Sequence, residues 1–340
     1  MNSSSSPSKI LHIHPTRRCN LRCLHCYSSS GPEAREELSF TVLEKAIAAS
    51  RAEGFNLLSV SGGEPALYKP LPQLLDSARQ SGMNTAMVSN GMLLNDRCLA
   101  SLQGRLDLLA ISLDGMPASH NHMRNHGQAF ETMQSRLPSI QASGIPFGFL
   151  FTLTHQNFKE FDWVVNFALE HGAKLLQIHP LEPQGRAKAG LAAEIGPNGN
   201  LAAYAYLKVM RLQQTLGDRL HLQLDLTHQQ VLRAHPDHFF AGGGIQDPMQ
   251  AKLSDLIAPL IIEPDGTVVP LQYGFARQYA LGNLRDASLQ DLGQQWRQRT
   301  YPKFLALCRQ EYEAMAVPRD LPIVDWYGAL AASANIPLAA

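Results

Sequence analysis

The first half of the chain alternates short apolar runs with longer amphipathic segments. Apolar runs such as Leu-Leu-Ala-Ile at 108–111 are typical of strands buried in a helix-covered parallel sheet. Segments with apolar residues at helical spacing that end at a glycine favour helices. The pattern predicts six strands, at residues 10–14, 56–61, 85–89, 107–113, 146–154 and 174–180. It predicts helices between them at residues 40–53, 72–81, 97–102, 130–142 and 158–171.

Such strand–helix units curl into a full or partial (β/α) barrel or form an open doubly wound sheet, and periodicity alone leaves these architectures open. After Pro183 the pattern changes to a long helix, a hairpin around Pro264-Asp265-Gly266 and two further helices. We therefore expect an α/β chain with an alanine-rich, peripheral end at 329–340. Its predicted parts are a disordered tail (1–9), a barrel (10–190), a helical connection (191–256) and a C-terminal α+β domain (257–340).

Composition removes several classes of function. Of 340 residues, 45% are hydrophobic and 17% charged, which excludes wholesale disorder. Lys+Arg and Asp+Glu both number 29, so general nucleic-acid binding is not expected, although a local basic patch remains open. No apolar run reaches the roughly 18 residues of a membrane span. The serine-rich start has no signal-peptide pattern, so we expect a cytoplasmic protein without membrane contact.

Three of the five cysteines lie close together. Cys19, Cys23 and Cys26 follow the first predicted strand, whereas Cys98 and Cys308 stand alone. The clustered thiols are typical of metal ligands in a reducing compartment rather than of a disulfide scaffold. Zinc usually takes four protein ligands, whereas three thiolates suit an iron–sulfur cubane with one iron left open.

This Cys-x3-Cys-x2-Cys spacing resembles the motif of the radical S-adenosylmethionine (SAM) enzymes. Gly62-Gly63-Glu64-Pro65, Ser89-Asn90-Gly91 and Ser112-Leu113-Asp114-Gly115 follow the next three predicted strands in the order of that family. All stand at the carboxyl ends of strands, where barrel active sites assemble. The resemblance covers about residues 10–185 and implies a partial (β/α)6 TIM-like barrel.

The resemblance also implies the cofactors and their chemistry. One [4Fe-4S] cluster would be held by Cys19, Cys23 and Cys26, with SAM on the open iron. An electron donor such as flavodoxin or ferredoxin would drive SAM cleavage, and the resulting radical would take a hydrogen atom from substrate.

Ten further residues are implied as cofactor contacts. The two glycines would approach the methionine part of SAM with Glu64 near its ammonium group, and His25 would lie near the adenine. Ser112 and Asp114 would reach the ribose or carboxylate, Arg124 a carboxylate, and His179 the adenine or substrate. The set is His25, Gly62, Gly63, Glu64, Ser89, Asn90, Ser112, Asp114, Arg124 and His179.

The segment 260–292 resembles the SPASM extension of peptide- and tetrapyrrole-modifying radical SAM enzymes. That pattern has Pro-Cys after the hairpin, whereas here Pro270 precedes Leu271, and Ala241-Gly242-Gly243-Gly244 also lacks a cysteine. Because Cys308 alone cannot hold a cluster, we expect a SPASM-like scaffold without an auxiliary cluster. Cys308 is expected to be a buried helical thiol, with a role for it or Tyr273 as hydrogen donor left open.

The favoured function is radical SAM modification of a peptide or protein segment. The alternatives are modification of a tetrapyrrole or other small molecule, a zinc-stabilised binding module using His12 or His14, and a degenerate scaffold. No domain for cobalamin or leader-peptide recognition is evident in the sequence. The substrate, reaction outcome and oligomeric state are not specified by it.

Overall fold

The computed structural model describes residues 8–191, 199–240, 245, 247–318 and 320–335. The six predicted strands are confirmed, and each pairs in parallel with the next along the chain. They are β1 (Ile10–Ile13), β2 (Leu57–Val60), β3 (Asn84–Ser89), β4 (Leu108–Ser112), β5 (Phe147–Leu153) and β6 (Leu175–Pro180). Buried and more exposed residues alternate along β1, β2, β3 and β6, which reflects one face in the core and one toward the barrel interior, whereas β4 and β5 are buried at nearly every position.

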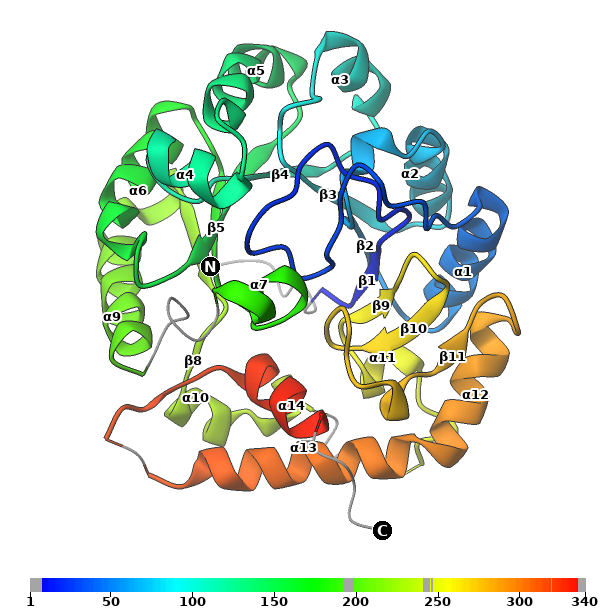
Figure 1. Ribbon diagram of the computed structural model, residues 1–340. Helices are drawn as coiled ribbons and strands as arrows, with labels where there is room; N and C mark the ends of the chain where they lie inside the picture. The colour runs from blue at the N-terminus through cyan, green and yellow to red at the C-terminus, as the bar shows by residue number, and fades with distance from the viewer. Residues whose placement is uncertain (1–7, 192–198, 241–244, 246, 319, 336–340) are drawn as a thin grey trace.

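Helices cover the outer side of these strands, as Figure 1 shows, so the architecture is a barrel rather than a doubly wound sheet. They are α1 (Phe40–Ala52), α2 (Leu71–Gln80), α3 (Asp96–Leu102), α4 (Pro117–Arg124), α5 (Ala129–Ser143) and α6 (Phe161–Glu170), with short 3-10 turns η1 (Pro65–Leu67) and η2 (Phe158–Glu160). The sequence pattern did not predict α4, because its residues Pro-Ala-Ser-His-Asn-His-Met-Arg form no apolar stripe.

The segment predicted as a helical connection also supplies a strand, so that prediction was wrong in part. β7 (His221–Leu224) pairs in parallel with β6. Its four residues alternate apolar and polar, too short a run to signal a strand. The other elements here are α7 (Gly185–Gly190), α9 (Gly199–Leu216), η3 (Gly217–Arg219), β8 (Thr227–His228), α10 (Gln229–Ala234), η4 (Pro236–His238) and α11 (Leu253–Leu256).

The C-terminal α+β segment extends the barrel sheet on its other edge. β9 (Leu260–Ile262) lies parallel to β1 and, through the predicted hairpin, antiparallel to β10 (Thr267–Pro270). After η5 (Arg277–Tyr279), β11 (Gly282–Asn283) pairs with β10 and completes a ten-stranded sheet. The sheet order is β11-β10-β9-β1-β2-β3-β4-β5-β6-β7.

Three final helices lie between the two edges of this sheet in Figure 1. They are α12 (Leu289–Arg299), α13 (Tyr301–Ala316) and α14 (Trp326–Ala334), and β12 (Ile323–Val324) pairs with β8. The prediction of a peripheral end from residue 329 was wrong for α14, because Leu330, Ala331 and Ala334 are buried. Residues 336–340 lie outside the described part.

At the other end of the chain, residues 1–7 of the predicted tail lie outside the described part. Lys9 is anchored, since its backbone N–H donates to Asn56 Oδ1 at 2.8 Å and its ammonium group pairs with Asp255. Among the described residues, no helix is long and apolar enough to cross a membrane.

Candidate functional site

The segment between β1 and α1 carries the three clustered cysteines. Cys19 and Cys23 are each 8% exposed, and Cys26 is half-buried. Together with Leu21 and Met92 they form one apolar cluster, so the fold brings the predicted thiol ligands together. We refer to residues 14–39 as the cysteine loop.

The chemistry of these sulfurs fits an iron–sulfur cluster. Burial raises the pKa of Cys19 to about 12 and also raises the pKa of Cys23, so both are thiols until a metal displaces the proton. The backbone N–H groups of Leu21 and Ser30 donate to Cys19 Sγ at 3.4 Å and Cys26 Sγ at 3.3 Å. Such donors favour a thiolate, the form that binds iron.

The same sulfurs do not form a site for a single zinc ion. Within the described ranges, no three His, Cys, Asp or Glu side chains converge on one metal position. A four-iron cluster has no such requirement, because each thiolate binds a different iron atom. The zinc alternative with His12 or His14 therefore lacks the ligand geometry it needs.

The two glycines after β2 pack directly against the cysteine loop. The N–H of Gly63 donates to Thr16 O at 2.9 Å, and that of Glu64 to Arg18 O at 2.9 Å. A Cβ added at Gly63 would lie 2.1 Å from Arg18 O, and one at Gly62 would lie 2.7 Å from Thr16 O. Glycine is therefore required at both positions, because a side chain would collide with the backbone of the cysteine loop. The sequence pattern did not predict this packing role. The predicted contact with SAM stays a prediction.

Glu64 links the ends of β2 and β3 to the cysteine loop. It is completely buried, and its carboxylate accepts from Ser89 Oγ at 2.8 Å, from Asn90 N at 2.9 Å and from Ala66 N at 3.2 Å. Asn90 Nδ2 in turn donates to Asn20 Oδ1 at 2.8 Å. Burial raises the pKa of Glu64, although these hydrogen bonds act to lower it. In this structure the side chain positions the loop.

A buried ion pair lies beside Cys23. Arg124 Nε is 2.6 Å from Asp114 Oδ2, and Arg124 Nη1 is 3.8 Å from Cys23 Sγ. His25 Nε2 and His120 Nδ1 lie 3.7 Å and 3.9 Å from the same carboxylate. The fold therefore brings the predicted residues His25, Asp114 and Arg124 together with the cysteine loop.

The charges of this group follow from burial and from the ion pair. Burial alone raises the pKa of Asp114, but the Arg124 guanidinium lowers it below its usual range. Burial also lowers the pKa of His25 and of His120 to about 4. At neutral pH the group therefore contains one carboxylate, one guanidinium and two neutral imidazoles.

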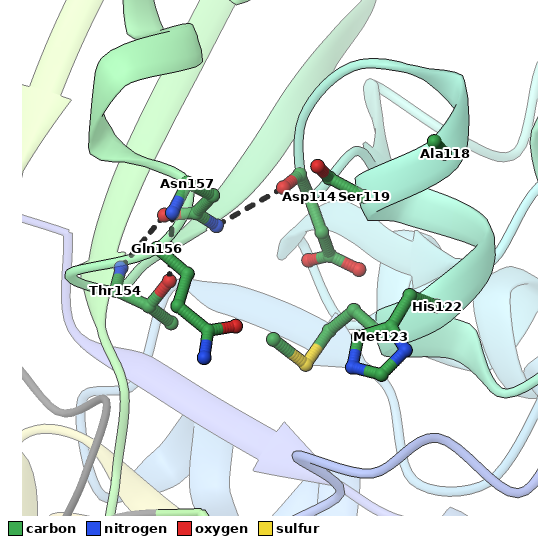
Figure 2. Close-up of a pocket in the computed structure, with 8 residues that line it drawn as sticks. All are labelled: Asp114, Ala118, Ser119, His122, Met123, Thr154, Gln156 and Asn157. Carbon is green, nitrogen blue, oxygen red and sulfur yellow. Dashed lines mark hydrogen bonds between the residues drawn. The ribbon is translucent and has the colours of Figure 1, made fainter.

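Asp114 lines a pocket of about 230 Å³ between α4 and the loop after β5 (Figure 2). Asn157 fixes this wall, because its Nδ2 donates to Asp114 O at 3.0 Å and to Thr152 O at 2.7 Å. Asp114 Oδ2 is held by the ion pair with Arg124, whereas Oδ1 accepts no hydrogen bond within the described part of the chain. A buried acceptor without donors beside a pocket is suited to a ligand that brings hydroxyl groups. Ser112, two residues before Asp114 at the end of β4, is also buried.

A second group of side chains gathers where β1 meets the C-terminal hairpin. The ring of His14 lies 4.8 Å from those of His12 and Tyr273 and 5.8 Å from that of Tyr27, by centroid. Tyr27 Oη is 3.0 Å from Ser61 Oγ. His14 is 1% exposed, and its Nδ1 has no partner among the residues described, nor has Nε2 of His12. We call His12, His14, Tyr27 and Tyr273 the aromatic group.

His179 stands between two carboxylates. Its Nδ1 is 2.9 Å from Asp225 Oδ2 and its Nε2 is 2.8 Å from Glu182 Oε1. Burial lowers the pKa of His179, but these two partners raise it well above its usual range. The side chain is therefore an imidazolium at neutral pH with both nitrogens engaged.

Cys308 and Leu271 both lie in the core. They are the positions that the SPASM resemblance singled out. Cys308 is 1% exposed within α13, which confirms the expected buried helical thiol. Leu271, which stands where the resemblance places a cysteine, is buried with a positive φ of 67°.

Sequence reasoning missed several residues of the site, namely Asn20, Met92, Thr154, Asn157 and Asp225. The sequence did indicate Thr154 and Asn157, because Thr154 ends a predicted strand and Asn157 follows it, at the carboxyl edge where barrel active sites assemble. None existed for Asp225, because its strand was not predicted.

Comparisons with known proteins agree with this geometry. A model of the radical SAM superfamily matches residues 13–168. Fe-coproporphyrin III synthase of Methanosarcina barkeri (strain Fusaro / DSM 804) is 31% identical over 173 residues, covering 50% of this chain and 43% of that protein. Sporulation killing factor maturation protein SkfB of Bacillus subtilis (strain 168) is 25% identical over 280 residues, covering 82% and 63%.

Among solved structures, Streptococcus suis SuiB bound to S-adenosylmethionine matches with a TM-score of 0.67 at 16% identity, covering 88% of this chain and 68% of that chain. This likeness shows a shared fold. The chain spans less than two-thirds of the length of both curated relatives.

Proposed function

We propose that the protein is a radical SAM enzyme that modifies a peptide or protein segment, a proposal supported by the match of the radical SAM superfamily model to residues 13–168. When bound, a [4Fe-4S] cluster and SAM supply a one-electron cleavage that yields methionine and a 5′-deoxyadenosyl radical able to take a hydrogen atom from substrate. The grouping of three thiols, two buried and one half-buried, beside an ion pair and a pocket is the observation that carries this proposal.

In this proposal Cys19, Cys23 and Cys26 hold the cluster. Arg124 neutralises part of the negative charge that deprotonation of Cys23 creates, since its guanidinium lies 3.8 Å from that sulfur. The apolar contacts of Leu21 and Met92 exclude water from the same sulfurs.

The pocket beside Asp114 would take one part of SAM. Its volume of about 230 Å³ is below the roughly 300 Å³ at which whole-ligand pockets begin. Asp114 Oδ1, which accepts no hydrogen bond among the described residues, suits a hydroxyl group of a ribose. His25 and Ser112 are proposed neighbours of this part, whereas Gly62, Gly63, Glu64 and Asn90 would act by positioning the loop.

Substrate would contact the aromatic group and the carboxylates of Asp225 and Glu182 that flank His179. His14 Nδ1 and His12 Nε2 are buried without partners in the described chain, so they can bond to substrate amide groups. A peptide is favoured over a tetrapyrrole because the SkfB match covers 82% of the chain, whereas the coproporphyrin synthase match covers 50%. That second match is the reason to keep a tetrapyrrole as the alternative substrate.

Anaerobic reconstitution with iron and sulfide tests the proposal. We expect about four irons per chain, and 5′-deoxyadenosine after addition of SAM and dithionite. Cys23→Ala should lose both, whereas Cys98→Ala, outside the cysteine loop, should keep both. About eight irons would contradict the single cluster, one zinc would favour the binding module, and iron without nucleoside would favour a degenerate scaffold.

A further inference from the structure

The segment after the C-terminal hairpin brings a phenol, that of Tyr273, next to the cysteine loop. The ring of Tyr273 lies 5.5 Å from that of Tyr27 and 4.8 Å from that of His14, by centroid. Tyr27 directly follows Cys26, one of the three proposed cluster ligands. An oxidisable side chain therefore stands beside the centre where the proposed function forms radicals.

The backbone on both sides of Tyr273 is fixed by hydrogen bonds. The N–H of Gln272 donates to Pro270 O at 2.8 Å. The N–H of Gly274 donates to Glu263 Oε1 at 2.6 Å, and Glu263 is 1% exposed, so little water competes for this bond. These contacts hold the position of the ring and do not involve its hydroxyl.

The hydroxyl of Tyr273 has no hydrogen-bond partner among the described residues, and the residue is only half-buried. Tyr27 differs, because its Oη is 3.0 Å from Ser61 Oγ. Burial raises the pKa of Tyr273 above its usual range, so the phenol keeps its hydrogen at neutral pH. An intact O–H group that faces no protein acceptor is open to a bound molecule.

The C-terminal segment provides no cluster that could take an electron from a substrate radical. Leu271 stands where the SPASM resemblance places a cysteine, and Cys308 is the only cysteine after residue 98. A carbon radical that is not oxidised can instead gain a hydrogen atom from a weaker bond, such as a thiol S–H or a phenol O–H. The site therefore needs a side chain that carries such a bond.

The thiols of the chain do not fill this role. Cys308 is 1% exposed in the core, and Cys98 belongs to α3 on the outer side of the barrel (Figure 1). The other three, Cys19, Cys23 and Cys26, are the proposed cluster ligands. A phenol beside the cysteine loop is thus the better placed donor.

We propose that Tyr273 gives its phenolic hydrogen atom to the carbon radical formed on the substrate; the inference rests on the proposed function. The O–H bond of Tyr273 breaks and a C–H bond forms on the substrate, which leaves a tyrosyl radical. One electron from the one-electron reductant that also drives SAM cleavage, and one proton from water, restore the phenol. The substrate leaves at its original oxidation level, as in the inversion of a carbon centre.

Deuterium transfer tests the proposal without a known substrate. The reconstituted protein is incubated with SAM and dithionite in deuterium oxide, so that the 5′-deoxyadenosyl radical is itself the carbon radical that gains a hydrogen atom. Phenolic hydrogens exchange with solvent and hydrogens on carbon do not. Transfer from Tyr273 therefore places one deuterium in 5′-deoxyadenosine, which mass spectrometry detects. Tyr273→Phe should still form the nucleoside but lose the label.

Two matched variants locate the transfer. Tyr279→Phe makes the same change at a phenol that is 2% exposed, and it should keep the label. Tyr27→Phe should also keep it, because that hydroxyl already has Ser61 as a partner. Tyr273→Phe should bind iron normally, since the deleted hydroxyl makes no hydrogen bond to the described residues.

Electron paramagnetic resonance of rapidly frozen samples gives a second readout. The unaltered protein should show a tyrosyl radical whose lines narrow when its tyrosines carry ring deuterium, and Tyr273→Phe should lack this signal. If Tyr273→Phe binds iron poorly, the signals of the unaltered protein and of Tyr27→Phe decide: a tyrosyl radical in both supports the proposal, and its absence from either overturns it.

The remaining outcomes separate the two proposals. Unlabelled nucleoside from the unaltered protein, a label kept in Tyr273→Phe, or an equal loss in Tyr279→Phe would overturn the hydrogen transfer alone. A label lost in Tyr27→Phe and kept in Tyr273→Phe would assign the transfer to the other phenol and overturn the proposal as well. Absence of any nucleoside from the unaltered protein would overturn the proposed function, and the hydrogen transfer with it.

Discussion

Replacing Arg124 with methionine should strongly destabilise the protein. Arg124 is 7% exposed, and its partner Asp114, 2.6 Å away, is 1% exposed. Removing one member of a buried pair leaves the other as an uncompensated charge, at a cost of about 3–5 kcal/mol. In the unaltered protein, burial lowers the pKa of the neighbouring His25 and His120 to about 4, so near pH 7 both rings are neutral and Arg124 is the cationic partner of the carboxylate.

The stability penalty of Arg124→Met should depend on pH, because it follows the protonation of Asp114. In the natural protein, Arg124 lowers the pKa of Asp114, so the pair contributes stability above about pH 4 and loses it as acid protonates the carboxylate. Without Arg124, burial raises that pKa, and a falling pH neutralises the unpaired carboxylate. The penalty of Arg124→Met should therefore be smaller near pH 5 than near pH 7.

Urea unfolding of the metal-free protein under anaerobic conditions measures both effects. The control is Arg79→Met, the same substitution in an exposed pair with Asp107 at 2.8 Å, which should cost at most about 1 kcal/mol. A double variant with Asp114→Asn should cost less than the sum of the single changes. A penalty for Arg124→Met below about 1 kcal/mol, or one equal at both pH values, would refute the reasoning.

Three further changes test other parts of the site. Gly63→Ala should displace the cysteine loop, because the new Cβ would lie 2.1 Å from Arg18 O, and the iron bound after reconstitution should fall; Gly127→Ala, with no atom within 4 Å, should load normally. Glu64→Gln should lower the free energy of unfolding by about 1–3 kcal/mol, since an amide nitrogen cannot accept and the N–H of either Ala66 or Asn90 then loses its acceptor; an unchanged urea midpoint would contradict this. The lowered pKa of His120 makes the folded protein lose stability as pH falls from about 6.5 to about 4, so His120→Phe should flatten urea midpoints over that range; an unaltered slope would count against it.

The parts of the fold that could be predicted are those with a local signal. The six barrel strands are apolar runs, and three of them, β2, β3 and β4, end at the glycine-containing motifs that predicted Glu64, Asn90 and Asp114 as site residues. β7 and α4 lack such patterns, so Asp225 and the wall of the pocket beside Asp114 were not foreseen.

Other features depend on contacts between distant segments. The closeness of His14 to Tyr273 follows from the pairing of β1 with β9, strands separated by most of the chain. The requirement for glycine at position 63 likewise comes from the backbone of Arg18, which no sequence pattern places there.

The position of β1 between β2 and β9 has a consequence for anyone who shortens this chain. A fragment ending before residue 257 would keep the cysteine loop and the motifs after β2, β3 and β4 but would leave β1, the strand that leads into that loop, without its partner β9. Open backbone amides and carbonyls on such a strand invite pairing with another molecule. Such a fragment should therefore aggregate, because the C-terminal hairpin is what covers the open edge of its first strand.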